Sequence, residues 1–212
     1  NNFATMNPLY KWDNVMVYSN GNLSLTGNGG SWSGSSSTLG ISSGKWYYEA
    51  KFTSATYIDS WYIGFGGLDD FNLSAPYRNG IFFVNSAGGE IDVGDTGTVE
   101  RTTNDYGTFA NGDIMGVALD YDNETISIYK NGSIIVDNFN YGATTYSSTV
   151  KGGKTIAPCI AHYGDGALSF NFGSPPFSIS SGNTDGNGYG NFEYSVPSGY
   201  YSLNSKNLAE FG

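Results

Sequence analysis

The chain alternates between apolar and polar residues with a period of two over several short stretches. In KWYYEAKFTS, residues 45–54, the alternation predicts a β-strand whose apolar residues, from Trp46 to Phe52, share one face. The opposite face, which includes Glu49, would meet solvent. We therefore expect a half-buried strand at this position.

A second unit, GDIMGVALDYDNETISIYKNGSIIVD, predicts three strands in a meander, separated by an acidic bend and by an Asn-Gly pair. Asn-Gly favours the positive φ angles of a type I′ hairpin turn. In the middle strand we expect Ile126 and Ile128 to point into the core and Ser127 and Tyr129 to point outward.

Apolar runs predict further strands at 60–68 and 80–88. The run TIAPCIAHYGDGALSFNFG at 155–173 predicts two more, joined by a glycine turn at 164–166. The prolines of SPPF, residues 174–177, lack the backbone donor that a central strand needs. We expect the sheet to end there.

Two stretches rich in glycine, serine and asparagine predict irregular structure. GNGGSWSGSSS, residues 27–37, is expected to form a loop or a mobile sheet edge, and SSGNTDGNGYGN, residues 180–191, a surface excursion. Near the end, Asn204–Glu210 fits at most a short helical turn. Elsewhere no window has helical periodicity, which indicates an all-β protein with a single domain over residues 1–212.

The charge balance argues against two classes of partner. The chain has 19 acidic and 9 basic side chains, a net charge of −10, and its only arginines are Arg78 and Arg101. Few groups are available to neutralise phosphates, so we expect no nucleic-acid partner. The same charge disfavours an anionic membrane surface, and every apolar run is shorter than the ~20 residues that span a bilayer. We expect no membrane insertion.

Four segments, in order along the chain, resemble a known family. They are SSGKWYYEAKF at 42–52, WYIGFG at 61–66, GDIMGVALDYDNETISIYKNG at 112–132 and IAPCIAHYGDGALSFNFGSPPF at 156–177. Together they resemble a SPRY (B30.2-like) domain, with a core at 42–177 between flanking segments 1–41 and 178–212. The resemblance implies a concanavalin-like bent β-sandwich of two antiparallel sheets, which agrees with the meander.

The resemblance also implies a function. SPRY domains are similar to one another in being non-catalytic recognition modules that bind through loops at one edge of the sandwich. The flanks NNFATMNPLY and GYYSLNSKNLAEFG resemble sequences that bracket such units in bacteriophage structural proteins. We therefore expect a domain on the virion surface, as a capsid decoration, a fibre or a receptor-contact domain. It would bind virion neighbours or a host-surface glycan, in a homo-oligomeric assembly. An extracellular adhesin or lectin is the alternative. The sequence has no cofactor motif, and we expect no cofactor.

Candidate binding residues follow from the resemblance and from side-chain type. In the family, the stretch before the glycine turn lines the ligand surface, and it corresponds here to His162 and Tyr163. Five more side chains lie in or beside predicted loops and are of types that anchor protein interfaces or stack on sugar rings. They are Tyr57, Trp61, Tyr77, Arg78 and Tyr106. Aromatic residues make up 16% of the chain, so core packing competes for each of them.

The stretch GEIDVGD at 89–95 offers an enzymatic alternative, because it resembles the catalytic strand of concanavalin-like β-glucanases. A retaining glycosidase needs two carboxyl groups about 5–5.5 Å apart. Glu90 and Asp95 would lie on opposite faces of a regular strand unless a bulge at Gly94 realigns them. We expect no enzyme and keep glycan hydrolysis by this pair as the alternative.

Two further patterns do not form a recognised site. In DYDNETISIYKNG, residues 120–132, carboxylates alternate as in a calcium loop, but Thr125 and Asn131 replace the required glycine and glutamate. We interpret this segment as an acidic bend without a metal. The single histidine, His162, and the single cysteine, Cys159, would point to opposite faces of one strand and form no catalytic dyad.

Overall fold

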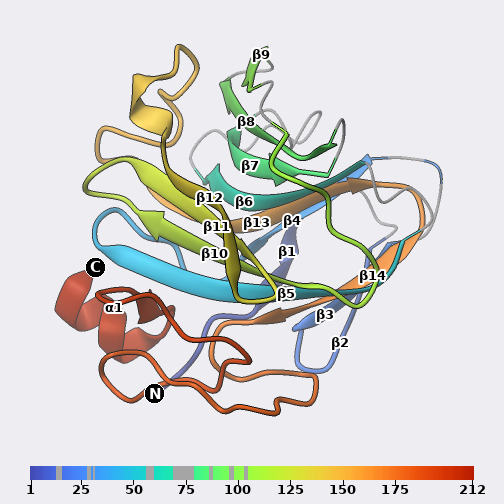
Figure 1. The fold of residues 1–212 in the computed structure, drawn as a ribbon, viewed down its shortest axis with the longest axis vertical. Helices are drawn as coiled ribbons and strands as arrows, with labels where there is room; N and C mark the ends of the chain where they lie inside the picture. The colour runs from blue at the N-terminus through green and yellow to red at the C-terminus, as the bar shows by residue number, and fades with distance from the viewer. Residues whose placement is uncertain are drawn as a thin grey trace.

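Two β-sheets face each other across one hydrophobic core in the computed structural model (Figure 1). The structure describes residues 1–12, 16–27, 30, 32–55, 60–68, 79–85, 88–95, 98–102 and 105–212. Neighbouring strands within each sheet are antiparallel, apart from one two-residue strand that pairs in parallel. The predicted all-β sandwich is confirmed.

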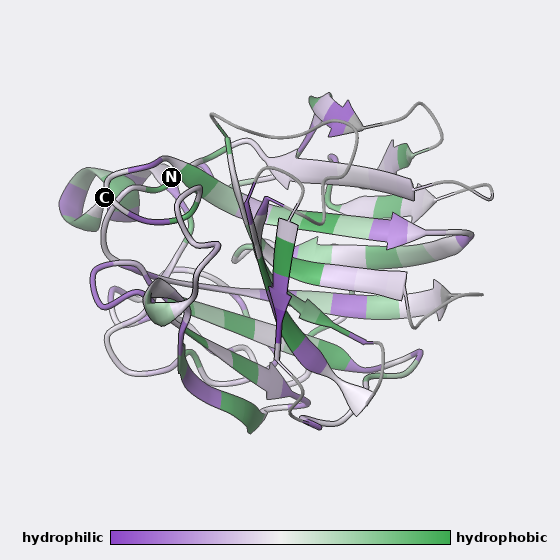
Figure 2. Cartoon of the chain, turned by 90° about the horizontal axis from the view of Figure 1, so that it is seen from above, coloured by the Kyte–Doolittle hydropathy of each residue, from purple (hydrophilic) through white to green (hydrophobic). Residues whose placement is uncertain are grey.

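The first sheet contains, in spatial order, β1 (Met6–Trp12), β4 (Trp32–Ser37), β13 (Ile156–Tyr163), β6 (Trp61–Gly67), β7 (Gly80–Val84), β8 (Glu90–Asp95) and β9 (Thr98–Arg101). The second contains β12 (Ser133–Asn140), β11 (Thr125–Lys130), β10 (Ile114–Asp120), β5 (Lys45–Ala55), β14 (Gly166–Asn171), β3 (Ser24–Gly27) and β2 (Val17–Ser19). β15 (Tyr201–Ser202) pairs with β5 in parallel. A 3-10 helix, η4, spans Tyr141–Ala143, and the helix α1 spans Ser205–Phe211. Figure 2 shows hydrophobic positions recurring along the strands, with hydrophilic positions between them.

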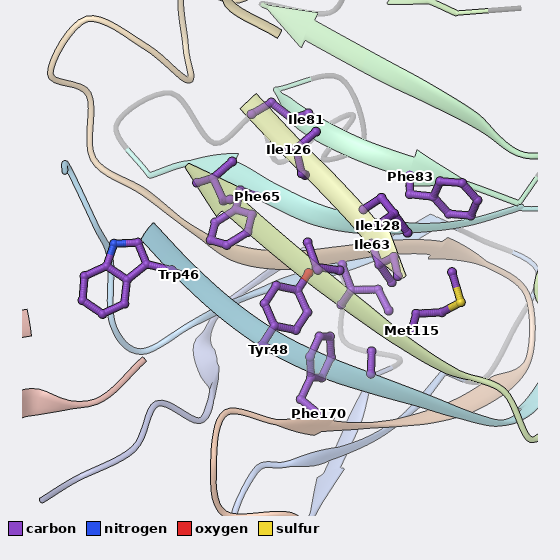
Figure 3. Close-up of a cluster of buried hydrophobic side chains, with 14 of the residues drawn as sticks. Trp46, Tyr48, Ile63, Phe65, Ile81, Phe83, Met115, Ile126, Ile128 and Phe170 are labelled. Carbon is purple, nitrogen blue, oxygen red and sulfur yellow. The ribbon is translucent and has the colours of Figure 1, made fainter. Parts of the chain in front are cut away.

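The inner face of β5 is at the centre of the core. Its side chains from Trp46 to Phe52 are buried, as the alternation predicts, and they pack against residues of both sheets (Figure 3). Tyr48 contacts the rings of Phe65 and Phe170, and its hydroxyl donates a 2.9 Å hydrogen bond to the carbonyl of Gly64 in the opposite sheet. A buried tyrosine hydroxyl needs such a partner. Tyr48 therefore connects the two sheets through both apolar and polar contacts.

The outer face of β5 is also buried around Tyr47 and Glu49, beneath the C-terminal segment (residues 178–212), which runs outside the second sheet (Figure 1). The carboxylate of Glu49 accepts hydrogen bonds from the backbone N–H groups of Glu193 and Tyr194, at 3.1 and 2.8 Å. Beside it, the ring of Tyr47 packs edge-on against Phe192. The prediction that the face with Glu49 meets solvent is therefore wrong, because the C-terminal segment covers this face.

A second buried carboxylate holds the C-terminal segment together. Asp185 accepts hydrogen bonds from the backbone N–H and the hydroxyl of Ser202 and from the side-chain amide of Asn207. The side chain of Asn204 accepts from the backbone N–H groups of Lys206 and Asn207 and so caps α1. The expected helical turn is present. The predicted surface excursion at 180–191 is exposed over much of its length, but the hydrogen bonds of Asp185 fix it to the rest of the C-terminal segment.

The predicted meander is formed by β10, β11 and β12. Asn131 and Gly132 have φ angles of 48° and 80°, as a type I′ turn requires. Ile126 and Ile128 are fully buried in the core. Tyr129 lies on the outer side, where it packs against the cluster around Tyr47. The inward and outward directions are as expected, and the outer side is itself covered, since Ser127 is only 3% exposed.

The serine-rich run expected to be a loop instead forms β4, an internal strand of the first sheet. β4 pairs with β1 on one side and β13 on the other. The residues from Ser33 to Ser37 are buried. Their small side chains lack the apolar alternation that identifies a strand, and the flanking strands supply the hydrogen bonds.

Replacing Glu49 by alanine should loosen the C-terminal segment. Two backbone N–H groups and the side-chain amide of Asn171 would lose their acceptor, and we expect a loss of about 2–4 kcal/mol in the free energy of unfolding. Urea denaturation measures the loss, and hydrogen exchange at Glu193 and Tyr194 locates it. Glu100→Ala is the matched control, since Glu100 accepts one exposed N–H, from Thr145. Equal losses in both variants would contradict the assignment.

Candidate recognition site

The structure separates the residues proposed for the ligand surface. Tyr57, Tyr77 and Arg78 lie outside the described residues. Tyr106 is partly buried and packs against the main core. The remaining three, Trp61, His162 and Tyr163, lie together at one end of the sandwich, but on two different faces of the first sheet.

Trp61 and His162 point inward. Their rings stack at a centroid distance of 4.5 Å with an angle of 18° between planes, and both residues are at most 1% exposed. Across the sandwich, the paired glycines Gly27 and Gly166 of β3 and β14 face them. A Cβ atom on Gly27 would overlap the imidazole, and one on Gly166 would overlap the indole. This end of the sandwich is closed by two rings against two glycines.

Tyr163 points outward and belongs to a cluster of aromatic rings on the outer face of the first sheet. The ring of Trp32 lies 5.7 Å from that of Tyr163 and 5.5 Å from that of Tyr62. Gly34 and Ala161, which share this face, leave room for the indole to reach Tyr62. Trp32 and Tyr163 are partly exposed, whereas Tyr62 is 6% exposed. We call Trp32, Tyr62 and Tyr163 the outer aromatic cluster.

Sequence reasoning missed two of these three residues. Trp32 was assigned to a loop, because the small residues that follow it have no strand pattern. Tyr62 lies in a correctly predicted strand, where alternation with the inward Trp61 would have placed it on the outer face.

A buried charged group lies on the same outer face, at the far edge of the sheet. Arg101 forms two 3.0 Å hydrogen bonds to the carboxylate of Asp92 and an ion pair of 3.2 Å with Glu90. Asp92 is fully buried, while the Arg101 side chain is 51% exposed. Burial raises the pKa of Asp92, and the hydrogen bond and charge of Arg101 oppose that shift. The ion pair also raises the pKa of Arg101.

Glu90 and Asp95 do not converge as a hydrolytic pair. β8 keeps a regular register with β7 and β9, so no bulge at Gly94 changes the alternation. Glu90 therefore lies on the outer face with Asp92, while Asp95 lies on the face of Ile91 and Val93, which point into the core. The side chain of Asp95 accepts a hydrogen bond from Ser148 at the strand end. Hydrolysis by this pair is not supported by the geometry.

The acidic bend is held by hydrogen bonds within the protein. Asp120 pairs with Lys45 at 2.7 Å and accepts from the backbone and side chain of Asn123. Asp122 accepts from the N–H of Gly44. Across the described part of the chain, no group of three or more His, Cys, Asp or Glu side chains is arranged to hold a metal ion. Nor does that part contain a helix long and apolar enough to cross a membrane.

Comparison with known proteins identifies the fold family. The family model of the SPRY domain matches residues 45–175. The chain belongs to the SPRY domain family. SPRY domains are generally protein-interaction modules, which is consistent with a non-catalytic binding role.

Solved SPRY structures agree with this assignment. The SPRY domain of human HERC1 is similar with a TM-score of 0.57 and 19% identity, over 78% of this chain and 96% of that chain. The PSpry domain of TRIM65 is similar with a TM-score of 0.55 and 10% identity, over 80% of this chain and 89% of that chain. No curated protein matches the chain. At these identities the likeness establishes the fold alone.

Removing Arg101 should destabilise the protein in a pH-dependent way. Arg101→Ala leaves the carboxylates of Asp92 and Glu90 without their cation. We expect a loss of about 1–3 kcal/mol at pH 7, below the value for a fully buried pair because the arginine is half-exposed. A raised folded pKa favours the protonated carboxyl. The loss should therefore be small at low pH and grow as pH rises through the folded pKa of Asp92.

Urea unfolding of Arg101→Ala at pH 4 and pH 7 measures this difference. The double variant Asp92→Asn/Arg101→Ala is the control, because it removes the main buried charge together with its partner and should recover much of the stability at pH 7. An equal loss at both pH values would show that the guanidinium contributes packing rather than charge compensation.

Proposed function

We propose that this SPRY domain is a non-catalytic recognition module that binds a protein partner over the outer aromatic cluster. The supporting observation is the contact of three aromatic rings, from Trp32, Tyr62 and Tyr163, on a sheet face at the end where β13 finishes. Aromatic side chains bury much apolar area while losing few rotamers, so they are common anchors of protein interfaces. Farther along this face Phe82, Val84, Cys159 and Ala161 are buried, so the accessible part is the one that Trp32 and Tyr163 form.

Arg101 adds a second anchor of the kind that interfaces favour. Its guanidinium is half-exposed and lies close enough to Tyr62 for an electrostatic interaction. Its geometry is fixed by the two hydrogen bonds to Asp92, so little side-chain entropy would be lost when a partner contacts its free edge.

A host-surface glycan is the second candidate ligand. Tryptophan and tyrosine rings also stack on the apolar faces of sugars, and Trp32 and Tyr163 are both partly exposed. A glycan array with the purified domain distinguishes the two candidates, because a lectin would bind defined glycans without releasing products.

We further propose that the domain is exposed on a bacteriophage particle, as a decoration, fibre or receptor-contact domain. The support is the resemblance of the two flanks to sequences in phage structural proteins, together with an acidic, turn-rich chain with a net charge of −10. In the structure the flanks contribute β1–β4 and the cover of the second sheet. Mass spectrometry of purified particles tests the location. Recovery solely from a bacterial envelope would favour the adhesin alternative.

The binding surface can be tested by site-specific photo-crosslinking. A benzophenone side chain at position 163 should give a discrete crosslinked partner from intact particles or host envelopes. Trp32→Ala should reduce that product about tenfold or more, as expected for an interface anchor worth about 1.4 kcal/mol or more. Circular dichroism and urea unfolding must show that the Trp32→Ala variant remains folded.

The matched control is the same crosslinker at Ile134, which is 46% exposed on β12 of the second sheet. Ile134→Ala should leave the crosslink from position 163 unchanged. A crosslink of equal yield from position 134, or one that is insensitive to Trp32→Ala, would place the partner elsewhere.

A further inference from the structure

Three neighbouring side chains on the inner face of the first sheet have buried polar atoms with few partners among the described residues. Ser33 on β4, His162 on β13 and Trp61 on β6 stand side by side in the strand register. The hydroxyl of Ser33, the indole N–H of Trp61 and both ring nitrogens of His162 are buried, and among the described residues the one partner assigned to any of them is the backbone of Gly164, beside His162. Buried polar groups are ordinarily paired, so this row is an unusual feature of the core.

His162 also lacks a charged neighbour among the described residues. The residues that surround the His162–Trp61 stack cannot be ionised and so carry no charge. Gly27 of β3, Ser33 of β4 and Trp61 of β6 adjoin His162 itself, and Phe52 of β5 and Gly166 of β14 lie against Trp61. Asp165, the nearest acidic residue in sequence among those described, is exposed in the turn after β13. An imidazolium formed here would therefore have no described counter-charge.

Two opposing effects act on a protonated His162. The face of Trp61 would attract the cation, since the two rings are stacked. Burial of a charge without a counter-charge is costly, and the one hydrogen-bond partner assigned to the imidazole among the described residues is the backbone of Gly164. Burial accordingly lowers the pKa of His162 to about 4, while the nearby backbone of Gly164 opposes part of that shift.

The strands around the stack all begin or end close to it. Gly27 is the last residue of β3, Trp61 and Gly166 are the first residues of β6 and β14, and His162 is the residue before the last in β13. Ser33 is the second residue of β4. Moving the imidazole into water thus requires fraying strand ends, while the middle of the sandwich can remain packed.

We propose that His162 makes this end of the sandwich an acid-sensitive latch, which opens locally when the imidazole is protonated. The open state places the imidazolium in water and separates the His162–Trp61 stack from the Gly27–Gly166 pair. Tyr163 and Trp32 directly adjoin His162 and Ser33 on the same two strands. Opening therefore disturbs the outer aromatic cluster and weakens partner binding at acidic pH. This last consequence rests on the proposed function, whereas the latch itself does not.

Proton NMR provides a direct test, because His162 is the only histidine in the chain. The C2–H resonance should titrate well below the usual midpoint of about 6.5. Hydrogen exchange should show loss of protection at the ends of β3, β13 and β14 over the same pH range, with α1 and the β10–β12 meander still protected. A midpoint near 6.5, or simultaneous loss of protection throughout the chain, would overturn the latch.

Substitutions test whether the local acid transition arises from protonation of His162 or of a carboxylate. His162→Gln should abolish the local acid transition, and Asp165→Asn should retain it. If His162→Gln fails to fold, Trp61→Phe provides a second test. The protein should then lose the quenching of the Trp61 indole by the protonated imidazole, which leaves only the fluorescence change of the outer aromatic cluster, while the C2–H of His162 still titrates. An unchanged acid transition in His162→Gln, or its loss in Asp165→Asn, would assign opening to a carboxylate.

Partner binding is measured separately, by the crosslink from position 163. If the acid transition occurs as expected but no partner is crosslinked, the proposed function is refuted and the latch is not.

Discussion

The central strand of the second sheet must be covered on both faces, and much of the architecture follows from this constraint. The inner face of β5 holds the large rings around Tyr48, which pack against both sheets. Its outer face holds Tyr47 and Glu49, one aromatic and one charged. A carboxylate at such a position needs several hydrogen-bond donors, and the backbone near residue 193 supplies them. The C-terminal segment is therefore part of the domain's core structure.

Both outer faces of the sandwich contain buried side chains, and they differ in which side chains stay accessible. The second sheet is covered around Tyr47 by residues of its own chain, with Phe192 packed against that ring, while Ile134 on β12 stays 46% exposed. The first sheet places Trp32 and Tyr163, both partly exposed, on its outer side. The polar edge at Arg101 and the aromatic end at Tyr163 belong to this same sheet.

The sequence predicts the parts of the fold that depend on local chemistry. Period-two alternation identifies β5, and the Asn-Gly pair defines the turn between β11 and β12. It does not predict β4, because a strand of serines and glycine depends on neighbours that are distant in the sequence. It also assigns Glu49 to solvent, since alternation distinguishes two faces without revealing whether a later segment covers one of them.

The candidate site was predicted less completely for the same reason. Resemblance to the SPRY family led to Tyr163 and to its neighbour His162, yet these two residues point to opposite sides of β13. Trp32 becomes visible as part of a cluster once β4 is paired with β13. The separation of Glu90 from Asp95, in contrast, follows from strand alternation alone and is confirmed by the regular register of β8.

At the end of the sandwich, the rings of Trp61 and His162 fill the space beside Gly27 and Gly166. The size of the side chain at each of these positions therefore limits the size that the others can have. A methyl group at position 27 or 166 has no space while the rings of His162 and Trp61 are present. Substitutions at these four positions should therefore arise together during divergence. In a homologue with a larger residue at either glycine position, we expect a smaller side chain at position 61 or 162. Such a chain would keep the sandwich fold and lose the stacked imidazole.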